Sequence, residues 1–195
     1  MNIERRSFTV ELRAEPDADR ITGYAAVFDS LSEDLGGFRE IIRPGAFARS
    51  LQESPDVRAF WQHDPSRILG RTTAGTLSVS EDEHGLRFDI TPPSGPTGQD
   101  ALEAIRRGDV DQMSFGFKVE QDRMLKREDG TILRELLDVH LIEVSPVTFP
   151  AYQATQAEVR SDLQARIEEL NATPFDPMTD PESLLRELDL EAATA

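Results

Sequence analysis

Short segments in which polar and apolar side chains alternate recur along most of the chain, and they narrow the choice of fold more than any other property. These segments are residues 7–12, 21–28, 77–79, 86–90, 113–119 and 136–147. Side chains two positions apart lie on the same face of a strand, so each segment predicts a strand. Turns are expected at Glu83-His84-Gly85, which closes a hairpin, and at Asp129-Gly130. We therefore expect an α+β, mainly β fold: an antiparallel β-barrel, closed or partly closed, flanked by short helices.

Two short helices are predicted between these strands. Pro44 suits the first turn of a helix of about ten residues that ends before Pro55. A second helix is expected from about residue 98 to residue 107, with Thr97 as its N-cap residue and Gly108 at its end.

The C-terminal part differs from the rest in composition. Residues 156–195 carry 10 acids against 3 arginines and no glycine. Apolar residues recur at helical spacing at Val159, Leu163, Ile167 and Leu170, and a short helix is expected to start at Asp180-Pro181-Glu182. We divide the chain into a body, residues 1–155, and an acidic helical tail, residues 156–195. The tail is either an arm that docks on a partner or a solvated terminal segment.

The charge of the chain limits its partners. Asp and Glu number 37 against 21 Lys and Arg, which gives a net charge of −16 over 195 residues. A chain this acidic repels phosphate backbones and anionic membrane surfaces, so we expect it to bind neither nucleic acid nor membrane. No apolar run approaches the roughly 18 to 20 residues that span a bilayer, and residues 1–12 do not form a secretory signal. We expect a soluble intracellular enzyme or a protein-binding module.

Cofactor chemistry has no support in the sequence. The chain has no cysteine, which excludes disulfides, cysteine nucleophiles and thiolate metal sites. The three histidines have no HxH, HxxxH or HExxH spacing, and no GxxxxGK[ST] or GxGxxG motif occurs. We expect no metal and no cofactor.

Two side chains stand out as candidates for chemistry. His63 follows Phe60-Trp61-Gln62 and precedes Asp64-Pro65, so it lies at the end of an apolar strand, where it is held in place and still reaches solvent. Ser114 shares one strand face with Gly116, while three large apolar residues around it form the other face. This leaves a small-residue patch around one hydroxyl. The alternatives are a structural histidine and a strand serine that faces solvent.

A carboxylate is the third candidate. By simple alternation Leu137, Val139, Leu141 and Glu143 point the same way, which places Glu143 on an apolar face. A carboxylate there needs a partner, and an imidazole is a natural one. The alternative is that Glu143 caps the end of the strand. The same alternation places Asp138 and His140 on the opposite face, although a bulge could reverse that.

The order of several segments resembles the prohead (capsid maturation) proteases of tailed bacteriophages of the HK97 type. The segments are residues 22–28, 41–47, His63, 113–117 and 141–147, with Pro150-Ala151 close behind. The resemblance covers about residues 5 to 155. It implies a serine endopeptidase with a fold similar to that of the herpesvirus assemblins.

The resemblance also implies roles for the candidates. The nucleophile falls on Ser114 and the general base on His63. The third member falls on Glu143, with Asp138 and His140 as alternatives. His140 is considered because the herpesvirus relatives use a second histidine. An oxyanion hole from backbone N–H groups, or an arginine such as Arg71, is required.

The function implied is cleavage of the scaffolding region of the major capsid protein, and of the protease itself, inside the procapsid that assembles in the host cytoplasm. The gene would belong to a phage or prophage. The alternative is a non-catalytic assembly or scaffold protein that keeps the barrel and docks through its acidic tail.

Overall fold

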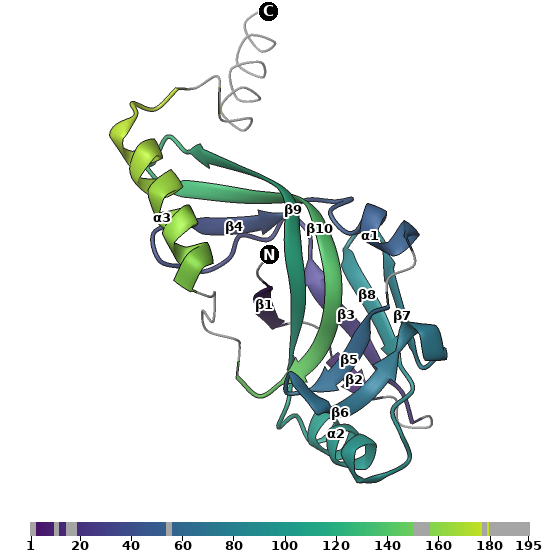
Figure 1. Ribbon diagram of the computed structural model, residues 1–195. Helices are drawn as coiled ribbons and strands as arrows, with labels where there is room; N and C mark the ends of the chain where they lie inside the picture. Colours follow the sequence, from purple (N-terminus) through teal and green to yellow (C-terminus); the bar gives the residue numbers. More distant parts are fainter. Residues whose placement is uncertain are drawn as a thin grey trace, which may run out of the picture.

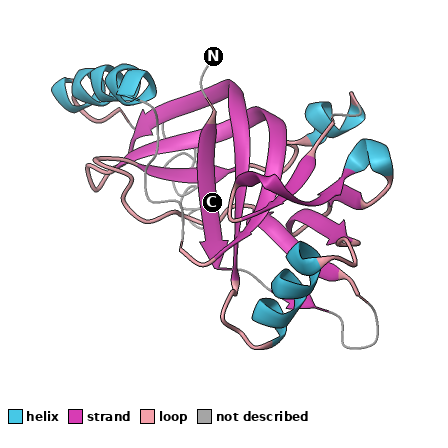
Figure 2. Ribbon diagram, turned by 60° about the horizontal axis from the view of Figure 1, so that its bottom comes forward, coloured by secondary structure: helices cyan, strands magenta, loops and turns pink. Residues whose placement is uncertain are grey.

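The computed structural model describes residues 3–9, 12–14, 19–53, 56–149, 157–176 and 179. In chain order its elements are β1 (Glu4–Thr9), β2 (Leu12–Ala14), β3 (Ile21–Val27), β4 (Arg39–Ile42), α1 (Ala48–Gln52), β5 (Arg58–Trp61), β6 (Asp64–Arg71), the 3-10 helix η1 (Thr72–Ala74), β7 (Leu77–Glu81), β8 (Gly85–Ile90), α2 (Pro96–Arg106), β9 (Gln112–Lys126), β10 (Ile132–Val147) and α3 (Ala157–Ala172). Strands occupy the middle of the molecule and helices lie at its periphery (Figure 2).

The larger sheet is built around the long hairpin of β9 and β10 (Figure 1). Its strand order is β1-β9-β10-β5-β6, and β4 also pairs with β10. β9 pairs antiparallel with both β1 and β10, whereas β4 and β5 run parallel to β10. Because β10 has 16 residues, it accommodates both parallel partners, β4 along its first half and β5 near its end.

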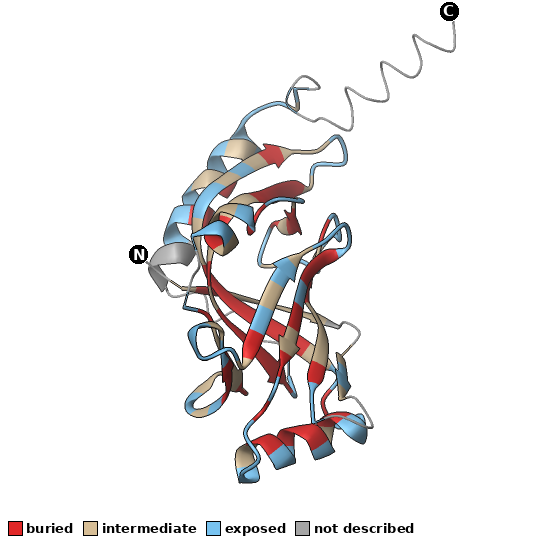
Figure 3. Ribbon diagram, turned by 90° about the vertical axis from the view of Figure 1, so that its right-hand side faces the viewer, coloured by how far each residue is buried: buried red, intermediate tan, exposed pale blue. Residues whose placement is uncertain are grey.

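The smaller sheet is antiparallel and has the order β2-β3-β8-β7. The predicted hairpin around Glu83-His84-Gly85 is confirmed as β7 and β8. One cluster of buried side chains joins the two sheets and α2, including Phe88 of β8, Phe115 of β9 and Leu102 of α2. The buried residues concentrate on the strands, and α2 carries buried and exposed residues in turn (Figure 3).

The expectation of a mainly β fold with short helices is confirmed, but the expectation of an antiparallel barrel is wrong. Within the described ranges the strands form two open sheets, and two of the pairings are parallel. Alternation identifies which face of a strand is buried, but it does not determine which strands pair. Whether the sheet closes into a barrel therefore cannot be predicted from the alternation alone.

The predicted body helices are present with different boundaries. The first is only the five-residue α1, because Gly45 takes a φ of 88° and interrupts the helix that Pro44 was expected to start. The second, α2, has Gly95 as its N-cap residue and Pro96 in its first turn, rather than Thr97 at the cap. None of the described helices is long and apolar enough to cross a membrane.

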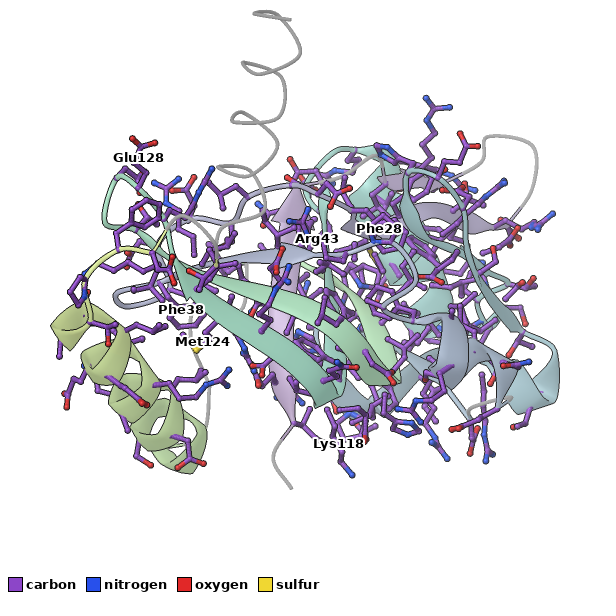
Figure 4. The ribbon with its side chains drawn as sticks, turned by 90° about the horizontal axis from the view of Figure 1, so that it is seen from above. Phe28, Phe38, Arg43, Lys118, Met124 and Glu128 are labelled. Atoms are coloured by element: carbon purple, nitrogen blue, oxygen red, sulfur yellow. The ribbon has the colours of Figure 1, made fainter. Side chains whose placement is uncertain are left out.

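The predicted tail helix is confirmed as α3. Its Leu163 and Ile167 are buried against Phe38 and Ile132, with Met124 packed beside them. Figure 4 labels Phe38 and Met124, which lie next to this helix. The helix therefore covers the turn end of the β9–β10 hairpin. The helix predicted from Asp180 lies outside the described residues.

Candidate active site

His63 lies in a strained turn. Trp61 and Asp64 pair across the β5–β6 hairpin, and the two residues between them, Gln62 and His63, have φ values of 58° and 59°. Two consecutive positive φ angles are the geometry of a type I′ turn, which favours Asn and Gly. Placing residues with a Cβ there costs about 1–2 kcal/mol each, and such strain clusters at functional sites.

Contacts with the end of β10 hold this turn. The backbone N–H of Gln62 donates to the carbonyl of Pro146 at 3.1 Å. Its side-chain amide donates to Thr148 Oγ1 at 2.7 Å and accepts from the backbone N–H of Thr148 at 3.0 Å. The turn that carries His63 is thus fixed to the strand that carries Glu143.

Ser114 is the third residue of β9, near the start of the strand, opposite Ser7 of β1 and Ser145 of β10. It is fully buried, so the alternative of a serine that faces solvent is wrong. The alternation predicted around it is present: Phe115 and its apolar neighbours on β9 join the core on one face, and Ser114 shares the other face with Gly116.

Glu143 reaches the face of Ser114 because β10 has a bulge. Leu141 pairs with Phe117, but Glu143 pairs with Gly116, so Ile142 is an extra residue between them. The expectation that Glu143 shares the apolar face of Leu141 is therefore wrong. The extra residue reverses the alternation and puts the carboxylate on the strand face that Ser114 occupies.

The carboxylate of Glu143 accepts three hydrogen bonds. His63 Nδ1 lies 2.6 Å from its Oε1, the Arg5 Nε–H donates to the same oxygen at 3.2 Å, and the Ser145 hydroxyl donates to Oε2 at 2.6 Å. Glu143 is 3% exposed, and the side chain of His63 is 17% exposed. An N–H on Nδ1 satisfies this contact, which leaves Nε2 of a neutral imidazole as the acceptor.

The environment keeps Glu143 ionised. Burial alone raises the pKa of Glu143, but the hydrogen bond and charge of His63, followed by the hydrogen bonds from Ser145 and Arg5, outweigh it and lower the pKa below its usual value. A carboxylate that stays charged beside an imidazole fixes its tautomer and stabilises its protonated form.

Gly116 makes room for this carboxylate. A Cβ at residue 116 would lie 2.8 Å from Glu143 Oε1 and 2.9 Å from its Cγ. Only glycine leaves the cross-strand position of Glu143 free.

Two buried polar atoms at this place have no hydrogen-bond partner: Ser114 Oγ and His63 Nε2. Among the described residues only Arg49 Nη2 and Asp138 Oδ1 share that condition. The Ser114–His63 hydrogen bond is thus not formed in this structure. A buried polar atom without a partner costs about 1–3 kcal/mol, which points to a role outside folding.

The alternatives to Glu143 lie elsewhere or make no contact. Asp138 accepts from the Arg49 Nε–H of α1 at 2.7 Å. His140 pairs with Lys118, which places it on the face of Glu143 and corrects the expectation of the opposite face. Its side chain has no hydrogen bond or ion pair with any described residue. Arg71, a candidate for the oxyanion hole, donates from Nε and Nη2 to Asp56.

Three contributors were not predicted from the sequence: Arg5, Ser145 and Gln62. Ser145 lies within the segment 141–147 that carries the resemblance, so its position beside Glu143 was a usable signal. Arg5 had no such signal in the sequence, because only the register of β1 on β9 places it opposite Gly116.

The described residues contain no group of three His, Asp or Glu side chains that could hold a metal ion.

Comparison with known proteins supplies the class of reaction. No curated protein and no solved structure matches the chain. A family model described as "Caudovirus prohead serine protease" matches residues 8–169, which extends from β1 into α3. Since this match covers well over half of the 195 residues, the chain belongs to the caudovirus prohead serine protease family and is a serine protease.

Proposed function

We propose that this protease cleaves the scaffolding region of the major capsid protein, and itself, inside the procapsid that assembles in the host cytoplasm. The family assignment supports a role in procapsid maturation. The observation that carries the proposal for the site is the 2.6 Å contact between His63 Nδ1 and Glu143 on the strand face of Ser114.

In the proposed mechanism Ser114, His63 and Glu143 act as nucleophile, general base and orienting acid. Ser114 Oγ attacks the scissile carbonyl while His63 Nε2 takes its proton, and Glu143 stabilises the imidazolium. The imidazolium then protonates the leaving amine as the C–N bond breaks. Water, deprotonated by the same nitrogen, hydrolyses the acyl-enzyme and regenerates the Ser114 hydroxyl.

The two atoms that must exchange the proton, Ser114 Oγ and His63 Nε2, are two of the four buried side-chain atoms without a hydrogen-bond partner among the described residues. Hydrogen bonds between catalytic groups are often long without substrate and shorten when it binds. We therefore place formation of the Ser114–His63 hydrogen bond in the substrate complex.

The test is co-expression with the major capsid protein of the same phage or prophage, with and without Ser114→Ala, followed by mass measurement of the capsid protein. The hydroxyl of Ser114 has no partner, so its removal should change the free energy of unfolding by no more than about 1 kcal/mol. Cleavage should fall on the order of 10⁴-fold or more. Ser78→Ala, on the exposed face of β7, is the matched control.

Wild-type processing by the Ser114→Ala variant would contradict the assignment of the nucleophile. A capsid protein that stays uncut with the wild-type chain as well would favour the alternative of a non-catalytic assembly protein that acts through its acidic tail.

A further inference from the structure

We propose that Ser145 and Arg5 are positioning residues that hold Glu143 in the orientation in which it accepts the Nδ1–H of His63. This inference rests on the proposed role of Glu143. It assigns a task to two side chains that touch neither the peptide nor the reacting atoms in the mechanism above.

Ser145 determines how the carboxylate group is rotated. The last torsion of a glutamate side chain is broad, so a carboxylate keeps one orientation only where its oxygens are bonded. Ser145 is fully buried and donates to Oε2 at 2.6 Å. Because Ser145, on the same strand β10, holds Oε2, the other oxygen Oε1 points toward the neighbouring strand β5. There it meets His63, which lies just beyond the end of β5.

Arg5 acts on the other oxygen. It lies opposite Gly116 on β1, and its Nε–H donates to Oε1 at 3.2 Å, the same atom that His63 contacts. Arg58 of β5 is in register with Glu143 on its other side, but its guanidinium donates to Asp56. Arg5 is therefore the cation that is bonded to Glu143, and at 35% exposure of its side chain its charge is partly screened.

These differences rank the two residues. The Ser145 bond is shorter and wholly buried, so its loss should matter more. Removing a group that orients another functional side chain typically costs about 10- to 100-fold. We expect that loss in kcat for Ser145→Ala, and a smaller loss of about 2- to 5-fold for Arg5→Met. Arg5→Lys should restore part of the Arg5→Met loss, since it keeps a cation and a donor.

A purely structural serine offers a matched control. Ser50 is also fully buried, and its Oγ accepts from the backbone N–H of Leu141, two residues before Glu143 on β10. Ser50→Ala removes a buried hydroxyl of the same kind without touching the carboxylate. It should lower the unfolding temperature at least as much as Ser145→Ala does, while kcat stays within about twofold.

The experiment measures kcat and KM of the full chain on a peptide that spans a capsid cleavage site mapped by mass spectrometry. Ser145→Ala should lower kcat with KM within about twofold, and in a Glu143→Gln background it should have little further effect, because its partner carboxylate is gone. Should Glu143→Gln not fold, Glu143→Ala serves as the background, with folding checked by circular dichroism.

Two results would overturn the inference: an unchanged kcat in Ser145→Ala, or the same loss in both backgrounds, which would show that Ser145 acts on something else. Failure of the proposed function has a different signature. In that case Ser114→Ala or Glu143→Gln alone would keep wild-type kcat, irrespective of Ser145.

Discussion

Gly116→Ala introduces one methyl group directly into the space of the Glu143 carboxylate. The added Cβ would lie 2.8 Å from Oε1, 2.9 Å from Cγ and 3.2 Å from Cδ. Carbon atoms in ordinary contact are about 3.5–4.0 Å apart, so the carboxylate has to withdraw by roughly 0.5–1 Å. β9 cannot yield instead, because Phe115 and Phe117 on either side of Gly116 are fully buried.

The magnitude follows from that displacement. A withdrawal of this size lengthens the 2.6 Å contact with His63 beyond good hydrogen-bond distance. A misplacement of about 1 Å in a catalytic group costs about 10²-fold in rate. Overpacking costs about 1–3 kcal/mol of stability, offset by about 0.5–1 kcal/mol because alanine restricts the unfolded chain more than glycine does.

The assay is peptide cleavage combined with thermal unfolding. We expect Gly116→Ala to lose about 10²-fold in kcat and about 1 kcal/mol in stability. Gly95→Ala is the control, because a Cβ there meets nothing within 4 Å. A Gly116→Ala variant that folds and retains wild-type kcat would refute the reasoning that the carboxylate must occupy the space above Gly116.

Three further outcomes are expected. Arg134 is 3% exposed and donates to Glu4, Glu40 and Asp122, which also accept from Arg6 or Arg166, so Arg134→Met should leave three carboxylates with only two arginines and cost about 3–5 kcal/mol in urea unfolding; a cost below about 1 kcal/mol would contradict a structural role for this cluster. Burial raises the pKa of Glu4, but the contacts with Arg134 and Arg6 outweigh it and hold the pKa below its usual value. The stabilisation that ionised Glu4 contributes is therefore present above the pKa of the unfolded state and is lost as the pH falls through the lowered pKa of the folded state. An unfolding midpoint in urea that stays constant from about pH 5 to pH 2 would disprove this prediction. The part of the tail after α3 is proposed to be separable from the catalytic body, so a chain that ends at Ala172 and keeps the packed helix α3 should still cleave peptide but enter proheads less efficiently; loss of peptide cleavage with unchanged incorporation would show that the tail completes the active site.

Much of the local structure follows from the sequence. The alternation in residues 113–117 identifies the buried face of β9, and with it the shared face of Ser114 and Gly116. The hairpin at Glu83-His84-Gly85 and the turn at Asp129-Gly130 are local features as well. These predictions succeed because the period of side-chain placement and the conformations of turn residues are properties of a few consecutive residues.

The candidate site was identified from the sequence, but its assembly was not. Resemblance points to His63, Ser114 and Glu143, and alternation places Glu143 on the wrong face. A single extra residue, Ile142, reverses that face, and nothing in the alternation of β10 marks the bulge. A bulge is stabilised by the partner strand and the packing around it, so it appears only when β9 and β10 are paired.

Long-range pairing determines the remainder. The register of β1 on β9 places Arg5 next to Glu143, and the parallel pairing of β5 with β10 places His63 within 2.6 Å of the carboxylate. The same pairing choices leave two open sheets where the strand pattern suggested a barrel. The pattern of a strand specifies which of its faces is buried, whereas its neighbour and register depend on which distant surfaces fit together once the chain has collapsed.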